Sequence, residues 1–310
     1  MRFLSDSPSM WNELKPGDAV LLPAFGSPPE VRDRLERLGC SVVDTTCGSV
    51  VFVWKNVDRF VRDGFTLVYH GTARHEEAIA TLARLRESQG GGSATVPYLV
   101  LENATQAEAL AAFFRGSASA TELLAAVPNR SVGFDPLVHL ERVGLASQTT
   151  MLARETLAIE QLLRGAMEAR FGASQVGDRL RVQDTICGAT QERQDAVVEL
   201  LREPLDLLMV VGGFTSSNSA HLAEIAARCV PTFHIEGPDD VLSAHAIHHR
   251  AGSGDRVVTS DWLPGGPVIV GLTSGASTPE EVVQAVIERI FEAGNSSSSQ
   301  AVGTTARTAP

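Results

Sequence analysis

The sequence of 310 residues carries 26 Lys and Arg residues against 37 Asp and Glu residues, a formal net charge of −11. This acidic balance disfavours a nucleic-acid or anionic-membrane surface, because such partners attract clustered Lys and Arg. No apolar run reaches the roughly 18 residues of a membrane-spanning helix, and the first residues lack the basic and apolar regions of a secretory signal. A hydrophobic content of 44% is ordinary for a globular protein, and the length allows two or three domains.

Short β-branched runs alternate along the chain with amphipathic helical stretches. Strands are predicted at 18–23, 40–44, 66–70, 97–101, 142–146, 179–183, 207–212, 231–235 and 267–273. Apolar residues at three- and four-residue spacing predict helices at 29–38, 49–62, 76–86, 153–170, 190–202, 219–228 and 279–292. This alternation predicts an α/β fold with parallel sheets and crossover helices. Small and polar residues predict surface loops at 88–94 and 114–120.

Two of the four cysteines lie in a repeated context. Residues 44–48 read Asp-Thr-Thr-Cys-Gly and residues 184–188 read Asp-Thr-Ile-Cys-Gly, and each segment follows a predicted strand and opens a predicted helix. Cys47 and Cys187 are therefore expected at helix N-termini, where the helix dipole and unpaired N–H groups favour the thiolate that binds a soft metal. Packing of two small residues in two similar turns explains the same pattern without a ligand.

Other metal and nucleotide patterns have little support. No Cys-x-x-Cys pair occurs, and neither a Gly-Lys-Ser/Thr loop nor a Gly-x-Gly-x-x-Gly after a strand is present. Cys40 and Cys229 have apolar neighbours and are predicted to be core residues. Residues 245–249, His-Ala-Ile-His-His, adjoin a Gly-Ser-Gly-Asp loop and are predicted to form a solvated turn rather than a metal site.

Polar side chains follow several predicted strands at their carboxyl ends, where open parallel sheets bind ligands. His75 and Glu77 open one helix, and Thr149 follows another strand within a Gln-Thr-Thr sequence. Two further loops, each rich in hydroxyl groups, precede helices and contain Ser216, Ser217, Asn218 and Ser277. Backbone N–H groups at a helix start, together with Ser and Asn side chains, form a neutral cradle for phosphate or diphosphate. Plain helix capping is the alternative explanation for these hydroxyl groups.

Several motifs occur in a fixed order: Asp-Thr-Thr-Cys, His-Gly-Thr-Ala-Arg-His-Glu-Glu, Gln-Thr-Thr-Met, Asp-Thr-Ile-Cys, Ser-Ser-Asn-Ser and Ser-Gly-Ala-Ser-Thr-Pro. As a set they closely resemble the IspH (LytB) family of 4-hydroxy-3-methylbut-2-enyl diphosphate reductases, in its plant and cyanobacterial form. The resemblance runs from about residue 18 to about residue 290. It implies a three-lobed α/β fold, in which small parallel-sheet α/β units surround a central cleft.

The resemblance also implies a set of functional residues. The family holds a 4Fe-4S cluster through three cysteines, and Cys47 and Cys187 match two of them. Glu77, His75 and Thr149 are the implied catalytic residues: Glu77 supplies protons, His75 faces the substrate, and Thr149 holds its hydroxyl. The residues implied to bind substrate are His75, Thr149, Ser216, Ser217, Asn218 and Ser277. The implied reaction removes a hydroxyl with two electrons and two protons and gives isopentenyl and dimethylallyl diphosphates.

Two departures from the family pattern affect these expectations. The Gly-Phe-Cys motif of the family's first cluster cysteine does not precede residue 18, so the third ligand is expected in an N-terminal segment missing from this sequence. Gly48 stands where the family usually has proline, which loosens that turn. The expected divisions are a remnant of the first lobe, the second lobe, the third lobe and a disordered tail, at 1–47, 48–186, 187–290 and 291–310. An incomplete first lobe is expected to expose apolar edges.

The expected function is therefore that of an iron–sulfur oxidoreductase of the non-mevalonate isoprenoid pathway. Its expected partners are a small diphosphate substrate and an electron donor such as ferredoxin, with no nucleic acid and no membrane. The expected compartment is the plastid stroma in a eukaryote and the cytoplasm otherwise. Two alternatives stay open: an inactive truncated homologue that binds a diphosphate or a protein partner, and a one- or two-metal site built from Cys47, Cys187 and His75.

Overall fold

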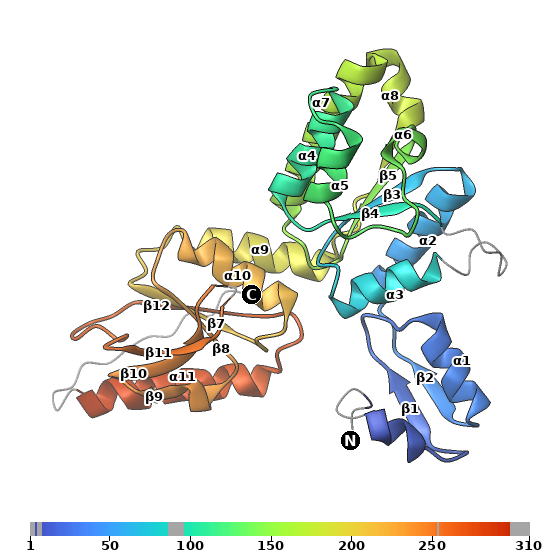
Figure 1. Cartoon of the computed structure of the whole chain (residues 1–310). Helices are drawn as coiled ribbons and strands as arrows, with labels where there is room; N and C mark the ends of the chain where they lie inside the picture. The colour runs from blue at the N-terminus through green and yellow to red at the C-terminus, as the bar shows by residue number, and fades with distance from the viewer. Residues whose placement is uncertain (1–3, 5–7, 86–95, 253, 298–310) are drawn as a thin grey trace. The chain divides into compact units, whose positions relative to one another are not determined.

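A computed structural model describes residue 4 and residues 8–85, 96–252 and 254–297 of the chain. The chain divides into two compact units, unit 1 with residues 1–149 and 153–186, and unit 2 with residues 150–152 and 187–310. The described residues form three sheets, two in unit 1 and one in unit 2 (Figure 1). The predicted α/β class is confirmed. In the part of the chain that the structure describes, no helix is both long and apolar enough to cross a membrane.

The first sheet of unit 1 is small and covered on one face. Its elements are η1 (Pro8–Asn12), β1 (Ala19–Leu22), α1 (Pro29–Arg37) and β2 (Ser41–Asp44). The two strands are parallel, and their inner side chains pack around Leu35 of α1. On the other face, Leu21 and Val43 lie opposite each other across the strands and are 54% and 48% exposed. This face of the small sheet therefore presents apolar side chains.

The second sheet of unit 1 is wholly parallel and covered on both faces. Its strands, in spatial order, are β4 (Tyr98–Leu101), β3 (Thr66–His70), β5 (Val143–Ser147) and β6 (Leu180–Val182). The helices on one face are α2 (Gly48–Arg62) and α3 (Glu76–Arg84). Those on the other face are α4 (Ala104–Phe114), α5 (Ala120–Ala126), α7 (Ala153–Phe171) and α8 (Ala173–Arg179) (Figure 1). A short helix, α6 (Pro136–His139), precedes β5.

The alternation of side chains along β3 builds the two cores of this sheet. Val68 packs with α4 and α7, whereas Leu67 and Tyr69 pack with α2 and α3. The central strands β3 and β5 are neighbours in register, with His70 paired to Ser147 at their carboxyl ends. The segments that follow these two strands therefore begin side by side.

The sheet of unit 2 is mixed rather than parallel. Its strands, in spatial order, are β11 (Arg256–Ser260), β10 (Ala246–Arg250), β8 (Thr232–Ile235), β7 (Leu207–Val211) and β12 (Val270–Ser274). Strand β9 (Val241–Ser243), which follows η2 (Pro238–Asp240), pairs with β10. Strands β8, β7 and β12 are parallel, and β10 pairs antiparallel with each of its neighbours.

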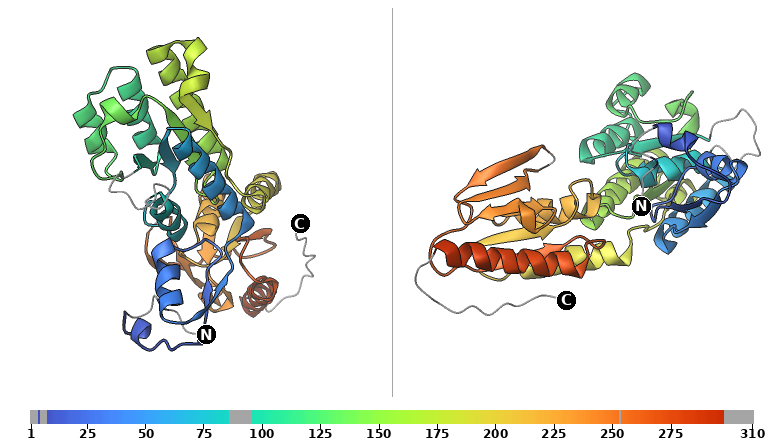
Figure 2. Two further views of the ribbon diagram at one scale, coloured as in Figure 1. Left: turned by 90° about the vertical axis from the view of Figure 1, so that its right-hand side faces the viewer. Right: turned by 90° about the horizontal axis from the view of Figure 1, so that it is seen from below.

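Helices cover both faces of this mixed sheet. Alternate side chains of β7 pack with α9 (Gly188–Leu200) and α10 (Ser217–Ala227) on one face and with α11 (Glu280–Ser297) on the other. Figure 2 shows α11, coloured red, lying along the sheet. Strands β7 and β12 are neighbours, so the loops that follow them begin at the same edge.

Three sequence predictions for unit 2 are wrong. Residues 246–249 of the predicted solvated turn lie in β10, where Ile247 is buried in the core of the sheet and the His249 ring packs against Phe233. The predicted tail starts too early, because Ala293 is buried in the sheet core and the helix continues to Ser297. Cys229 is exposed rather than part of the core, because α10 ends at Ala227 and the chain turns there. Residues 298–310 and the predicted loop at 88–94 lie outside the described residues.

Candidate functional site

The two similar cysteine turns have the same local structure. Cys47 is the N-cap of α2 and Cys187 is the N-cap of α9, both with extended backbone, at φ −63° and ψ 143° and at φ −77° and ψ 146°. Asp44 and Asp184 each accept a hydrogen bond from the backbone N–H two residues later, at 3.0 and 3.2 Å. The predicted reuse of one turn is confirmed, with a thiol at the start of one helix in each unit.

The two thiols differ in their surroundings. Cys187 is half-buried, and its Sγ accepts the backbone N–H of Thr190 at 3.3 Å and lies 3.0 Å from the Thr190 hydroxyl. Cys47 is exposed, and its side chain caps no backbone N–H among the described residues. No group of three or more His, Cys, Asp or Glu side chains in the described ranges is placed to hold a metal ion. Each turn therefore offers one thiol as a donor for a soft metal.

The carboxyl group of Glu77 is buried and held firmly by Thr149 in unit 1. Glu77 Oε1 accepts the backbone N–H of Thr149 at 2.8 Å, and Oε2 accepts the Thr149 hydroxyl at 2.6 Å. Burial to 1% exposure raises the pKa of the Glu77 carboxyl above its ordinary value, and hydrogen bonds from Thr149 and Tyr69 oppose that rise. A carboxyl group with a raised pKa that touches a threonine hydroxyl is suited to donating a proton.

This contact follows from the order of the strands. Helix α3 begins shortly after β3, and Thr149 comes two residues after β5. Because β3 and β5 are adjacent and parallel, Glu77 and Thr149 emerge at the same edge of the sheet. Two of the residues predicted from sequence are thus brought into direct contact.

His75 caps the helix that carries Glu77. Its Nδ1 accepts the backbone N–H of Glu77 at 3.1 Å, so Nδ1 has no proton and the neutral ring carries its proton on Nε2. Two backbone N–H groups of the preceding loop donate to Gln148 Oε1 at 3.1 Å and to Glu102 Oε1 at 2.9 Å. The ring of Phe25 packs edge-on against the imidazole, with centroids 6.2 Å apart. These contacts fix the backbone and the ring of His75.

The serines predicted to bind the substrate lie at adjacent strand ends of unit 2. Ser216 is the N-cap of α10, and its hydroxyl accepts the backbone N–H of Ser219 at 3.3 Å. The Ser217 hydroxyl accepts a hydrogen bond from the Thr150 hydroxyl at 3.1 Å. Ser277 is exposed on the loop between β12 and α11. Because β7 and β12 are neighbours, the loops that carry these serines start side by side.

The Asn218 amide is buried at the same helix start. The residue is 5% exposed, and neither Oδ1 nor Nδ2 has a hydrogen-bond partner among the described residues. An unpaired buried polar group costs about 1–3 kcal/mol, and such groups in native proteins call for a partner. At the first turn of α10 the helix dipole and the N–H groups favour an anion. The amide therefore indicates an anionic, hydrogen-bonding ligand.

Two glycines leave the space that the Ser219 side chain occupies at the ends of β7 and β12. A Cβ on Gly212, after β7, would lie 2.2 Å from the Ser219 hydroxyl oxygen, and a Cβ on Gly275, after β12, would lie 2.3 Å from the same atom. Real Cβ atoms do not approach so closely, so both strand ends need glycine for Ser219 to fit between them. The packing of the Ser216 and Ser219 hydroxyls thus depends on two glycines that are far apart in the sequence.

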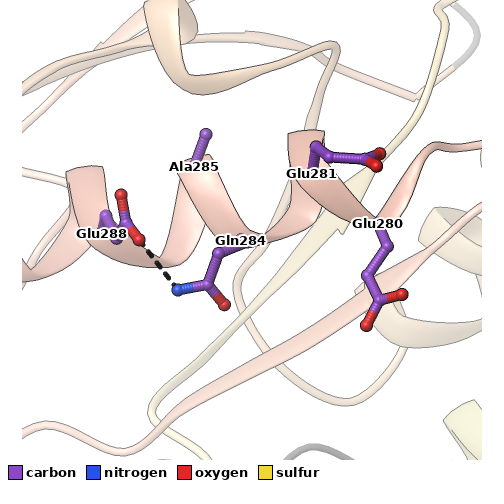
Figure 3. Close-up of a pocket in the computed structure, with 5 residues that line it drawn as sticks. All are labelled: Glu280, Glu281, Gln284, Ala285 and Glu288. Carbon is purple, nitrogen blue, oxygen red and sulfur yellow. Dashed lines mark hydrogen bonds between the residues drawn. The ribbon is translucent and has the colours of Figure 1, made fainter.

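A shallow hollow of about 370 Å³ on α11 has a different character (Figure 3). It is lined by Glu280, Glu281, Gln284, Ala285 and Glu288. Gln284 donates to Glu288 at 2.9 Å, and the three carboxylates would repel a diphosphate. This hollow does not fit the predicted ligand.

Sequence reasoning missed two residues that support the site. Tyr69 lies behind Glu77, and Glu102 holds the loop that precedes His75. Tyr69 lies within a buried strand, where the strand pattern alone explains it, and its polar hydroxyl is the available signal. Glu102 follows β4 directly, which is the same strand-end position that marks the other site residues.

The chain is similar to known proteins over most of its length. The profile of the LytB protein family matches residues 2–291. The chain belongs to the LytB family. The predicted family membership is confirmed, and it covers both units of the structure.

Two cyanobacterial LytB relatives are named 4-hydroxy-3-methylbut-2-enyl diphosphate reductase, the name that the resemblance implies. The protein of a Synechococcus strain is 42% identical over 278 residues, which cover 89% of this chain and 67% of the relative. The protein of Gloeobacter violaceus is 42% identical over 312 residues, with 98% and 72% covered. The chain thus spans about two thirds of the length of these relatives.

Two solved structures share the LytB fold. A structure of (E)-4-hydroxy-3-methyl-but-2-enyl diphosphate reductase, described as the terminal enzyme of the non-mevalonate pathway, matches with a TM-score of 0.50 and 28% identity, covering 90% of this chain and 78% of that one. The reductase from Plasmodium falciparum matches with a TM-score of 0.60 and 20% identity, covering 93% and 70%. The second match supports the fold alone.

Proposed function

We propose that this chain reductively removes the hydroxyl of 4-hydroxy-3-methylbut-2-enyl diphosphate and forms isopentenyl and dimethylallyl diphosphates. The names of its relatives supply the substrate. The observation on this chain that carries the proposal is the buried Glu77 carboxyl bound to Thr149. The reaction consumes two electrons and two protons, of which one leaves in water with the hydroxyl oxygen and one is added to carbon. A buried acid linked to a second hydroxyl suits these proton transfers.

In this proposal Thr149 contacts the substrate hydroxyl and Glu77 supplies the proton. The Thr149 hydroxyl donates to Glu77 Oε2 when the carboxyl is ionised. When the carboxyl is protonated, that hydrogen bond reverses, and Thr149 turns its own proton towards the leaving oxygen. His75, which carries its proton on Nε2 when neutral, donates a hydrogen bond to the substrate.

The helix start of α10 is proposed to hold the diphosphate. Ser216, Ser217 and Ser277 supply hydroxyl groups, and Asn218 supplies a buried amide donor. These are neutral donors at the positive end of a helix dipole, which bind an anion without a cation. The net charge of −11 is compatible with such a ligand, because the charge of the whole chain does not determine the local field at a helix N-terminus.

Replacement of Asn218 by leucine is expected to have opposite effects on binding and stability. Asn218→Leu removes an amide that has no partner in the described structure, so the free energy of unfolding should rise by about 1–2 kcal/mol. Affinity for inorganic diphosphate should fall at least about tenfold, because a buried hydrogen bond to a charged group is lost. Calorimetric titration and chemical denaturation measure the two effects.

The matched control for this variant is Asn56→Leu. Asn56 is also a buried helical asparagine, but its Nδ2 donates to the Phe52 carbonyl at 2.9 Å. This control should lose stability and keep its affinity for diphosphate. Unchanged diphosphate affinity in Asn218→Leu would remove Asn218 from the proposed site.

Cys47 and Cys187 are proposed as two ligands of a 4Fe-4S cluster. Both are thiols at helix starts in the same turn, which is the donor chemistry that such a cluster uses. Fe–S clusters normally take more protein sulfur than two thiols. Among the described residues, no three or more His, Cys, Asp or Glu side chains are grouped so that they could hold a metal ion. When bound, the cluster supplies electrons and a Lewis-acidic iron.

The remaining proposed partners follow from this chemistry. The two electrons require a donor such as ferredoxin, and the proposal includes neither nucleic acid nor membrane. Because the relatives are cyanobacterial, we propose the plastid stroma in a eukaryote or the cytoplasm of a prokaryote as the compartment.

An anaerobic assay tests the proposed function. The full chain is reconstituted with iron and sulfide, reduced with dithionite and mixed with the diphosphate substrate, and the two isomeric products are separated by liquid chromatography and identified by their masses and retention times. Formation of both five-carbon diphosphates supports the reductase. Iron-loaded protein that binds inorganic diphosphate but leaves the substrate unchanged supports instead an inactive homologue that only binds diphosphate.

A further inference from the structure

A tyrosine in the core of unit 1 contacts the Glu77 carboxyl. Tyr69 is on β3 and is fully buried, and its hydroxyl donates to Glu77 Oε1 across 3.5 Å. This is the oxygen that also accepts the Thr149 backbone N–H, so two donors approach Oε1 while the Thr149 hydroxyl approaches Oε2. The Tyr69 contact is long, and its effect on the carboxyl is expected to be modest.

The position of the Tyr69 ring is fixed by its neighbours. A Cβ on Gly71 would lie 2.9 Å from the tyrosine ring, so the ring uses space that only a glycine leaves open. The ring packs in the apolar cluster formed by β3, α2 and α3. A side chain held in this way cannot move away from Glu77 without disturbing the core.

Two further buried side chains lie on the same side of the sheet as Tyr69. The Trp54 indole N–H donates to the Thr81 hydroxyl at 3.1 Å, and Thr81, acting as a hydrogen-bond donor to Tyr69, opposes the rise in the Tyr69 pKa that burial causes. The indole nitrogen can only donate, so Thr81 accepts from Trp54, and the Tyr69 hydroxyl donates to Glu77. Trp54, Thr81 and Tyr69 are all buried.

We infer that Tyr69 is a positioning residue for Glu77, whose hydroxyl orients the carboxyl towards Thr149 and stabilises its ionised form. The role of Glu77 as proton donor belongs to the proposed function, and the inference rests on it. The titratable side chains that the structure places against Glu77 are Tyr69 on β3 and His75 at the start of α3. Burial, and next the charge of Glu77, keep the pKa of Tyr69 well above its ordinary value, so the phenol stays a donor.

The direction of the effect on pH dependence follows from these roles. Glu77 must be protonated to act as the acid, so activity falls as the pH rises through its pKa. Tyr69→Phe keeps the ring and removes one donor to the carboxylate, which raises the pKa of Glu77. The basic limb of the kcat profile should therefore move to higher pH by about half a pH unit to one pH unit.

Tyr69→Phe should show the same shift in a measurement that needs no turnover. In pH-difference infrared spectra of the full chain, the protonated carboxyl band that disappears in Glu77→Gln belongs to Glu77, and its midpoint should rise in Tyr69→Phe. Thr81→Val should shift it in the same direction by less, because it removes only the hydroxyl that donates to the tyrosine. The sequence contains one other tyrosine, Tyr98 on β4, and Tyr98→Phe is the control that should leave the midpoint unchanged.

The two measurements separate this inference from the proposed function. A raised infrared midpoint without any reductase activity supports the positioning role of Tyr69 and contradicts the proposed reaction. An unchanged or lowered midpoint in Tyr69→Phe overturns the inference, whether or not the chain is active.

Discussion

Glu77→Gln is expected to lower kcat by about 10²- to 10⁴-fold, the range typical of a lost general acid. The amide keeps the size of the side chain and still reaches Thr149, but it has no proton to give. Because Glu77 touches Thr149 rather than the diphosphate cradle of α10, KM should change little. Initial rates in the anaerobic assay, measured over a range of substrate concentrations, give both constants.

The adjacent carboxylate is the control for this prediction. Glu76 lies in the same first turn of α3 but is exposed. Glu76→Gln should keep kcat within about twofold, as expected for a surface substitution away from the site. A fall in kcat of similar size for both variants would show that the effect comes from the charge of the helix start rather than from an acid.

Cys187→Ser is expected to lose nearly all bound iron, and reductase activity with it. Serine keeps the N-cap of α9, because its oxygen can accept the Thr190 N–H that Cys187 Sγ now accepts. The fold should therefore persist while the soft donor for iron is removed. Iron and acid-labile sulfide analysis after anaerobic reconstitution, together with visible absorbance, measure the loss without relying on activity.

Cys229 provides a control for the loss of iron in Cys187→Ser. Cys229 is exposed, follows α10 and lies outside the repeated turn. Cys229→Ser should retain iron, and Cys47→Ser should lose it as Cys187→Ser does. If Cys47→Ser and Cys187→Ser retain as much iron as the unmodified chain and Cys229→Ser, neither turn provides a ligand.

The parallel part of the fold could be predicted from sequence because its signals are local. Strand β7 is a continuous apolar run, Leu-Leu-Met-Val-Val, that is followed by a helix, and this pattern predicts a buried parallel strand. The repeated Asp-Thr-x-Cys-Gly turn was also visible, because the aspartate, the cysteine cap and the helix start lie within five residues.

The antiparallel part could not be predicted in this way. Strand β10 reads Ala-Ile-His-His-Arg, with little apolar character, and its stability comes from pairing with β11, β8 and β9. Helix α4 is buried over much of its surface, so it lacks the polar stripe that marks an amphipathic helix. In both cases tertiary packing decides the structure, and neither element has a clear local signal.

Local sequence signals also identified only part of the candidate site. Residues at strand ends were found, because the carboxyl edge of a parallel sheet is a known place to look. The contact between Glu77 and Thr149, 72 residues apart, depends on the order of β3 and β5 in the sheet, which periodicity does not reveal. The role of Tyr69 has no clear local signal for the same reason, since its partner Glu77 lies on α3, which packs against β3.

The most direct test of the central claim is turnover in D₂O. The reconstituted, reduced chain is given unlabelled 4-hydroxy-3-methylbut-2-enyl diphosphate, and the products are analysed by mass spectrometry and deuterium NMR. Reductive removal of the hydroxyl predicts isopentenyl and dimethylallyl diphosphates that each carry a single solvent deuterium on carbon, formed at least about a hundredfold more slowly by Glu77→Gln. Recovery of unchanged substrate from iron-loaded protein, or products without deuterium, would contradict the account.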